Sequence, residues 1–327
     1  MKHKTDSLRG LCALLVMFHH VVMPLAGAQW VAVDAFFVMS GYFATITLAK
    51  GECVSKFYFH RIQRLYPLLL LVCLIYVIID RNAVDEVMLV LSSTSNWARC
   101  FDKILPAMAH TWSLSVTEQF YLVWPLIFLC KPKIKYLIAT VIVITVTRAI
   151  LIPHDPVFYN NFTPLRVDGL LIGAIAAMIP KTEQQNRAGK IATIGFILVA
   201  IVLPIMQVRY NYWTWIVLAL QGFVAIMLRN PFVDTKWLGW IGARSYGIFV
   251  WHLPVRMLVS SFMPEVYANS LETAWMNLIP LTIIYAMTFG LAYLSYRFLE
   301  RPLIEWGKKS HSIWLMPVYV KRAFVVL

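Results

Sequence analysis

Charged residues are scarce in this sequence, and acidic residues are scarcer than basic ones. Only 14% of the 327 residues are charged, with 16 Asp and Glu against 29 Lys and Arg, whereas 60% are hydrophobic. The mean hydropathy of +0.69 exceeds what one soluble core needs, so the composition indicates a polytopic membrane protein. The net charge of +13 does not indicate nucleic-acid binding, because the basic residues lie in short loops between apolar stretches.

The sequence also lacks the spacing of a metal or disulfide site. Its five cysteines include no CxxC pair and lie mostly in or near apolar stretches, so we expect structural or incidental roles and no bound metal. No soluble second domain or low-complexity stretch is visible. We predict one membrane domain over residues 1–306 and a cytoplasmic or interfacial tail over 307–327. No cleavage site clearly follows the first apolar run, so the first span is expected to be uncleaved.

Long apolar runs recur along the chain with the length of membrane-spanning helices, about 17 to 25 residues. Basic residues follow every even-numbered run, and little positive charge follows the odd-numbered ones. The positive-inside rule then places both termini in the cytoplasm. The sequence predicts an all-α polytopic membrane protein with about ten transmembrane helices. Their expected ranges are 8–27, 31–49, 65–80, 113–130, 135–153, 164–180, 190–206, 211–229, 238–262 and 275–299.

The largest segment on the external side is predicted at residues 81–110. We expect an extracytoplasmic substrate to bind there, and the segment is long enough to hold a short surface helix. His110, Trp97 and Trp112 are interpreted as an aromatic belt at the membrane interface.

The first span carries ionisable groups that are rare inside a membrane. At about 100° per residue, Arg9 and His20 differ by about 20° in helical phase, and Asp6 lies about 40° to the other side of the same stripe. His19 points about 80° away. Eleven residues rise about 16 Å, which places Arg9 at one membrane surface and His20 near the middle. His20 is therefore the candidate general base, against the alternative of a histidine that only packs helices.

Two acidic residues in apolar sequence are further candidates. Asp34 lies near the external start of the second span, where it orients a histidine, recognises acceptor hydroxyls or simply caps the helix. Glu118 lies within the fourth span, where an unpaired carboxylate is unfavourable. We expect it to have a partner such as Arg148, Arg166 or a histidine. A catalytic role for Glu118 is favoured over a structural ion pair.

Three more ionisable residues lie in later spans. His252 is a second imidazole near the middle of the membrane, and roles as a second base or in core packing are equally supported. Pro254 beside it indicates a broken or tightly packed helix. Arg166 and Asp168, near the external end of the sixth span, either bind the acceptor or pair with each other.

Seven short motifs run from Asp6 to about Pro302. Each is weak alone, but in this order they resemble the acyltransferase 3 family of integral-membrane O-acyltransferases, which modify bacterial surface glycans and some small molecules. Thr117 stands where the family usually has an acidic residue, and Glu118 keeps the second acidic position. The motifs are the Arg9–His20 pair, VDAFFVMSGY at 33–42, HRIQRLYP at 60–67, TWSLSVTEQFYLVWP at 111–125, RVDGLLIG at 166–173, SYGIFVWHLP at 245–254 and YRFLERP at 296–302.

The resemblance implies an O-acetyltransferase of the bacterial cytoplasmic (inner) membrane. It would move an acetyl group from acetyl-CoA to a hydroxyl of a surface glycan or lipid-linked saccharide. Such a transfer needs a base, donors for the developing oxyanion and a grip on the acyl donor. Arg61 and Arg64 share a face if they are helical, and their planar guanidinium groups suit the phosphates of coenzyme A, with Arg9 at the same surface. The alternative is that this pair only sets topology.

Other functions stay open at this point. A proton-coupled transporter or flippase of a glycan or small solute would use buried histidines and carboxylates equally well. The arginine pair and the lack of obvious inverted repeats favour the enzyme. An inactive family member that acts as a binding scaffold is kept open by Thr117, and a homo-oligomer is neither indicated nor excluded.

Overall fold

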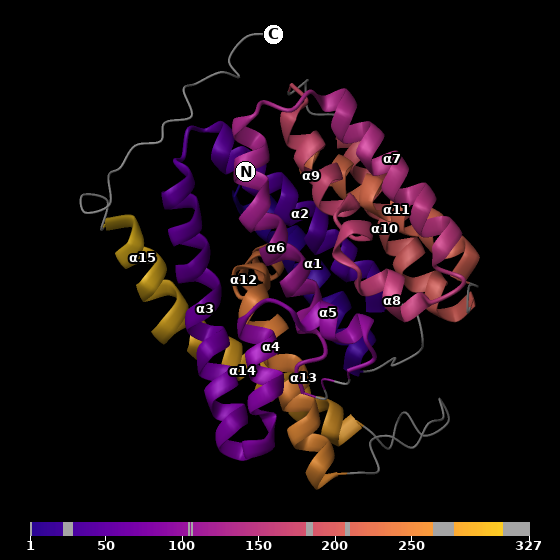
Figure 1. The fold of residues 1–327 in the computed structure, drawn as a ribbon. Helices are drawn as coiled ribbons and strands as arrows, with labels where there is room; N and C mark the ends of the chain where they lie inside the picture. Colours follow the sequence, from indigo (N-terminus) through magenta and orange to yellow (C-terminus); the bar gives the residue numbers. More distant parts are fainter. Residues whose placement is uncertain are drawn as a thin grey trace.

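The computed structural model describes residues 2–21, 29–103, 105, 107–180, 186–206, 210–263 and 278–309, and the regular structure in these ranges is entirely helical (Figure 1). The longer helices are α1 (Lys2–Val21), α2 (Gln29–Ala49), α3 (Val54–Ile79), α6 (Thr111–Leu129), α7 (Ile134–Leu151), α10 (Asn186–Met206), α11 (Tyr210–Arg229), α13 (Ser245–Phe262) and α14 (Leu278–Ser295). Shorter helices are α4 (Val84–Leu91), α5 (Ser95–Cys100), α8 (Pro156–Asn161), α9 (Asp168–Met178), α12 (Lys236–Ala243) and α15 (Arg301–Lys309).

Several of these helices have the length and composition of membrane spans. In the part of the chain that the structure describes, five stretches qualify: Ala32–Ala49, Val54–Ile79, Ile134–Leu151, Tyr212–Arg229 and Leu278–Gly307. Large apolar side chains point outward from them and from α6, for example Ile78 and Leu122, which are 69% and 64% exposed. An apolar outer surface of this kind matches lipid tails rather than water. The count of ten spans and the cytoplasmic termini stay predictions.

Three expected spans differ from the helices observed. The expected span at 238–262 is wrong as one continuous helix, because the chain breaks at Arg244 between α12 and α13. The span expected at 164–180 is shorter, since a 3-10 turn at Thr163–Leu165 precedes α9. The span expected to start at 65 is preceded by three more turns of α3, so Arg61 and Arg64 lie on a helix.

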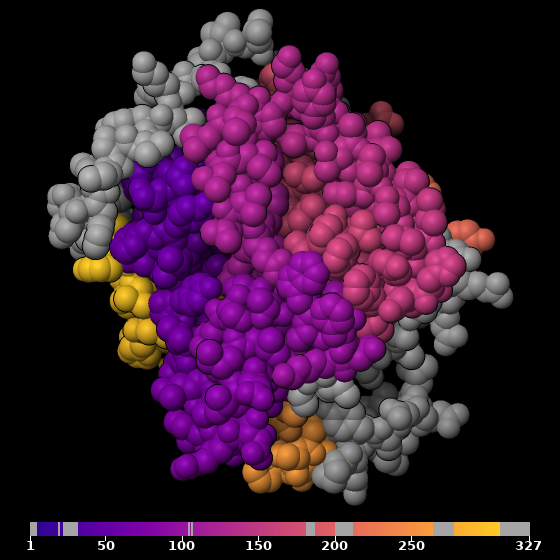
Figure 2. All heavy atoms as spheres, in the orientation of Figure 1, coloured from indigo at the N-terminus to yellow at the C-terminus, as the bar shows by residue number. Residues whose placement is uncertain are grey.

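The segment at residues 81–110, which the sequence places on the external side, contains two short α-helices, α4 and α5, where the sequence suggested one. In Figure 1, α3 runs from the turn after α2 at the upper end of the molecule to the lower end, where α4 follows. α15 lies along α3, and Figure 2 shows it at the edge of a face formed mainly by residues from α3 to α9. α15 crosses the boundary predicted at residue 306, and most of the expected tail lies outside the described residues.

Close backbone contacts fix the centre of the fold. α2 packs most extensively on α9, and α1 on α12. A Cβ atom at Gly41 of α2 would lie 1.8 Å from the carbonyl oxygen of Leu170, and one at Gly173 of α9 would lie 2.0 Å from that of Val38. Small residues at such crossings allow helices to approach closely in membranes. The chain can therefore hold polar side chains of α2 and α9 within hydrogen-bonding reach.

We predict that Gly41→Ala destabilises the protein by about 1–3 kcal/mol or more, because the added methyl overlaps the backbone of α9. The measurement is thermal unfolding of the purified protein in detergent. Gly222→Ala in α11 is the matched control, since nothing lies within 4 Å of its added Cβ. It should leave stability unchanged or raise it by about 0.5–1 kcal/mol. Equal melting temperatures for the two variants would contradict the close packing of α2 on α9.

Candidate active site

A cavity of about 850 Å³, a volume that includes space open to solvent, lies where α1, α2, α3, α6 and α13 meet. Its wall is apolar over much of its area and carries three arginines and several hydroxyl groups. The lining residues are Arg9, Val33, Phe36, Phe37, Met39, Ser40, Phe43, Arg61, Arg64, Leu65, Ser113, Leu114, Thr117, Tyr121, Ser245, Tyr246 and Phe249. Apolar walls with a few converging polar groups are typical of small-molecule sites.

The structure brings together the three arginines that were expected to hold the donor. Arg9 of α1 and Arg61 and Arg64 of α3 all line this cavity, although more than fifty residues separate the two helices' arginines in the sequence. Arg61 and Arg64 are three apart on α3 and project from one face, as expected for a helical pair. Their role as a donor grip remains a prediction.

The positive charge of these arginines is only partly balanced. Arg9 pairs with Asp6 at 3.2 Å, in agreement with their shared helical stripe, and its guanidinium lies over the ring of Phe43. Arg61 stacks on Tyr121 and donates to its hydroxyl at 3.4 Å. Among the described residues Arg64 has no ion pair within 4 Å. A cavity with this surplus of planar cations is suited to an anion such as a phosphate.

His20 lies in a cluster of three imidazoles. The ring centroids of His20 and His252 are 5.0 Å apart, and those of His252 and His110 are 4.9 Å apart. His110 and His252 are 3% and 0% exposed. α13 continues unbroken through Pro254, so the tightly packed alternative is the correct one for this helix. The two histidines predicted near the middle of the membrane are therefore neighbours.

Backbone hydrogen bonds fix the tautomers of two of these rings. Nδ1 of His20 lies 3.0 Å from the carbonyl oxygen of Val16, and Nδ1 of His252 lies 2.6 Å from that of Phe249. A carbonyl can only accept, so each Nδ1 carries the proton and donates. In the neutral ring Nε2 is then the basic nitrogen, which is the form that a general base requires.

His110 does not lie at the surface position that the sequence predicts. His110 and Trp112 are buried, 3% and 6% exposed, so their interpretation as an interfacial aromatic belt is wrong. The loop before α6 folds inward and brings His110 against His252. The sequence did contain a signal for this position, because His110 directly precedes the motif at 111–125 that carries Glu118.

Two residues of the external helices hold the loop that carries His110. Glu86 of α4 accepts hydrogen bonds from the backbone N–H of Met108 at 3.0 Å and from the hydroxyl of Tyr76 at 2.9 Å. Arg99, at the end of α5, donates to the carbonyl oxygen of Ala109 at 3.0 Å. Burial raises the pKa of Glu86 above its ordinary value, and these two hydrogen bonds offset part of that rise.

Glu118 has a different partner from the ones expected. Ser93, in the turn between α4 and α5, donates its hydroxyl to one carboxyl oxygen of Glu118. The prediction of Arg148, Arg166 or a histidine is wrong, because both arginines are paired elsewhere. The other carboxyl oxygen has no hydrogen-bond partner among the described residues. Its neighbour Thr117 lines the cavity, so Glu118 lies beside the site on the side of the external helices.

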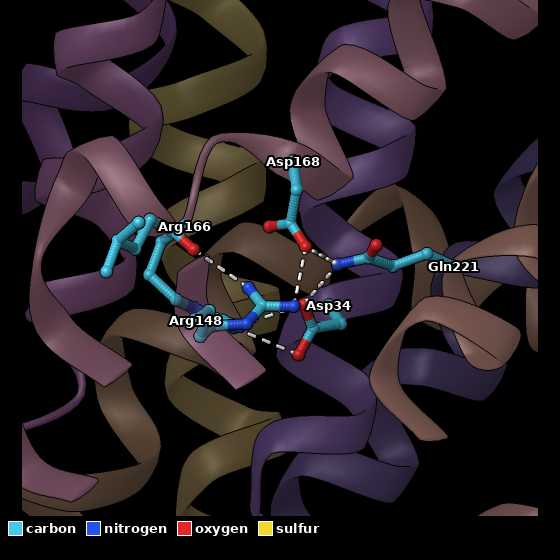
Figure 3. A network of polar contacts seen from close by, with 6 residues as sticks. Asp34, Arg148, Arg166, Asp168 and Gln221 are labelled. Atoms are coloured by element: carbon cyan, nitrogen blue, oxygen red, sulfur yellow. Dashed lines mark hydrogen bonds and ion pairs between the residues drawn. The ribbon is translucent and has the colours of Figure 1, made fainter. Parts of the chain in front are cut away.

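Four buried charges and one amide form a separate network behind the cavity (Figure 3). Arg166 binds both carboxyl oxygens of Asp34, at 3.1 and 3.0 Å. Arg148 binds Asp168 at 2.6 Å, and the amide of Gln221 donates to both Asp34 and Asp168. The network joins α2, α7, α9 and α11 and the turn before α9.

This network corrects several expectations. Asp34 lies in the second turn of α2 and binds an arginine, so the prediction that it caps the helix or orients a histidine is wrong. Arg166 and Asp168 do not form an ion pair with each other; each binds a partner that the sequence did not suggest. The guanidinium of Arg166 also lies 5.4 Å from the ring centre of Phe37, which lines the cavity. The network therefore supports one wall of the site.

A family model described as an acyltransferase domain, acyltransferase 3, matches residues 3–297. The chain belongs to the acyltransferase 3 family. This acyltransferase 3 chain is 30% identical to the peptidoglycan O-acetyltransferase OatA of Listeria monocytogenes and 25% identical to the O-acetyltransferase OatA of Staphylococcus aureus. Each match covers 94% of this chain and 58% of the relative, so the chain spans less than two thirds of their length. No solved structure gives a significant match.

The family match covers the residues that the structure brings together. The acyltransferase 3 match includes the arginines of the cavity, the histidine cluster and the buried network, and it ends within the last expected motif. It also favours an acyltransferase over the transporter alternative. In the described residues no group of three or more His, Cys, Asp or Glu side chains is arranged to hold a metal ion.

We predict that Arg166→Leu destabilises the protein by about 3–5 kcal/mol, because it leaves Asp34 buried without the guanidinium nitrogen that contacts both of its carboxyl oxygens. Arg301→Leu is the control. Arg301 also binds a carboxylate, that of Glu305 at 2.7 Å, but both side chains are more than half exposed. Surface pairs contribute about 0–1 kcal/mol, so the control should unfold near the wild-type temperature. Similar losses for both variants would show that the buried network has no special structural role.

Proposed function

We propose that this protein moves an acetyl group from cytoplasmic acetyl-CoA to a hydroxyl of a bacterial surface glycan, with His20 as general base. The observation that carries the proposal is the pairing of an arginine-lined cavity with a histidine cluster directly beside it. Phe249 lines the cavity, and its ring contacts those of both His110 and His252. A binding place for an anionic acyl donor and a base would thus lie next to each other.

The cavity supports binding of the donor from the cytoplasmic side. Arg9, Arg61 and Arg64 would hold the phosphates of coenzyme A, and the apolar wall would take the pantetheine arm and the thioester. The proposed topology, with ten spans and both termini in the cytoplasm, puts these arginines at the cytoplasmic surface. The external helices α4 and α5 would face the acceptor.

The transfer itself needs a proton to be removed from the acceptor. Nε2 of His20 would take the hydroxyl proton while the oxygen attacks the thioester carbon. The carbon–sulfur bond then breaks, and the proton passes from His20 to the departing thiolate of coenzyme A. A midplane reaction of this kind spares the charged donor from crossing the membrane.

The remaining candidates take supporting roles in this proposal. His252 either acts as a second base or orients His20. Glu118, held by Ser93, is offered as a residue near the acceptor path. Asp34, Arg166 and Asp168 were candidates for catalysis and acceptor binding. Asp34 pairs with Arg166, and Asp168 pairs with Arg148, so in this proposal they hold α2 against α9.

The relatives indicate which acceptor to test first. The OatA protein of Listeria monocytogenes is named as a peptidoglycan O-acetyltransferase, and we propose the same acceptor class here. Purified protein would be incubated with acetyl-CoA and peptidoglycan fragments, followed by measurement of released thiol and mass spectrometry of the glycan. If the protein acetylates a different surface glycan instead, the proposed reaction stands and the proposed acceptor is wrong.

We predict that His20→Ala lowers the transfer rate by about 100-fold or more, because general base catalysis contributes about 10²–10⁴-fold. The rate is measured as the mass of added acetyl on the acceptor over time. His154→Ala is the control, since His154 is exposed in the loop after α7, and its rate should equal that of the wild type. Retained acetylation in a folded His20→Ala protein would rule out this residue as the base.

We also predict that replacing Arg61 and Arg64 by lysine raises the KM for acetyl-CoA by about tenfold or more. Lysine preserves the charge and the topology but loses the bidentate fork, and a hydrogen bond to a charged group contributes about 1.5–3 kcal/mol. Lys133→Arg, in the exposed turn between α6 and α7, is a charge-preserving control with an unchanged KM. An unaltered KM in the double variant would show that these arginines do not bind the donor and only set the membrane topology.

A further inference from the structure

One aromatic ring of the cavity wall also contacts the histidine cluster. None of the three histidines lines the cavity, but Phe249 does, and its ring centroid is 4.9 Å from that of His110 and 5.9 Å from that of His252. His252 in turn contacts His20 at 5.0 Å. The ring of Phe249 therefore lies between the space that the arginines line and the histidine cluster.

The backbone around Phe249 is firmly held. One turn earlier on α13, the hydroxyl of Tyr246 donates to the carbonyl oxygen of Leu65 on α3 at 2.5 Å. The carbonyl oxygen of Phe249 itself accepts the hydrogen bond from Nδ1 of His252. These two contacts fix this turn of α13 relative to α3 and to the histidine cluster, so the position of the Phe249 ring is determined by the fold.

The lining of the cavity combines cationic and apolar side chains. Its three arginines carry the charge, and Phe43 lies under the guanidinium of Arg9. Phe249 is the lining residue whose ring contacts the histidine cluster, and Leu114, which also lines the cavity, packs in the apolar clusters on both sides. A donor with its phosphates on the arginines and its thioester near His20 would therefore place its acyl group beside Phe249.

We propose that the ring of Phe249 closes the inner end of the cavity against the acyl group and so restricts the donor to acetyl. The inference rests on the proposed function and adds a residue that determines specificity. The methyl of an acetyl group fits on the cavity side of the ring, whereas each further methylene of a longer acyl group meets the ring. Removing the ring opens space that a longer acyl chain can fill.

The test compares acetyl-, propionyl- and butyryl-CoA as donors for the purified full-length protein with peptidoglycan fragments. The measured quantity is the ratio of kcat/KM for butyryl to that for acetyl. One methylene in an apolar pocket changes such a ratio by about 10–200-fold. We expect Phe249→Ala to raise the ratio at least about tenfold, and Phe249→Leu to give an intermediate value that preserves packing if the alanine variant unfolds.

Phe43→Ala is the matched control, at a second phenylalanine of the cavity wall. Because Phe43 contacts Arg9 and not the histidine cluster, its loss should raise the KM for all three donors alike and leave the ratio unchanged. A wild-type ratio in folded Phe249→Leu and Phe249→Ala proteins, or equal use of butyryl and acetyl by the wild type, would overturn the role of Phe249 alone. A wild type that transfers no acyl group from any donor would overturn the proposed function as well.

Discussion

Charge compensation inside an apolar environment is the constraint on which this structure depends. An unpaired buried charge costs several kcal/mol, so a chain that spans a membrane must pair its charges or use them. The buried network pairs its charges. Two negative charges, on Asp34 and Asp168, cancel two positive charges, on Arg166 and Arg148. The arginines of the cavity are not cancelled in this way, because Asp6 pairs with Arg9 alone.

The two arrangements depend on each other through helix packing. α2 carries Asp34 on one face and Ser40, Phe37 and Phe43 on the cavity wall, so a shift of this helix would disturb both. Glycines at the α2–α9 crossing set the distance at which the buried ion pairs form. Rigid positioning of this kind matters for group transfer, because misplacing reacting atoms by about 1 Å can cost about 100-fold in rate.

Helical phase predicted correctly which residues share a face of one helix. The stripe of Asp6, Arg9 and His20 follows from the period of one helix, and the fork geometry of Arg61 and Arg64 follows from their spacing. Such reasoning works within a single element, where the repeat of 3.6 residues fixes relative directions.

Relations between elements were not predictable in the same way. Nothing in the sequence around Asp34 specifies that its partner lies 132 residues away, and nothing around Glu118 specifies Ser93. His110 was misplaced because an external loop was assumed to stay at the surface, whereas hydrogen bonds to Glu86 and Arg99 hold this loop inward. Hydropathy did not predict the helix break at Arg244 either, since apolar sequence continues on both sides of it.

The tautomers of His20 and His252 have a consequence for the order of events. A neutral imidazole carries one N–H, and each of these rings donates that proton from Nδ1 to a carbonyl of its own helix. Neither ring therefore has a proton on Nε2 at rest. At rest these two rings can take up a proton at Nε2 but have none to give there. A reaction that uses either ring at Nε2 therefore begins with removal of a proton from a substrate, and only afterwards can the same ring return it to a leaving group.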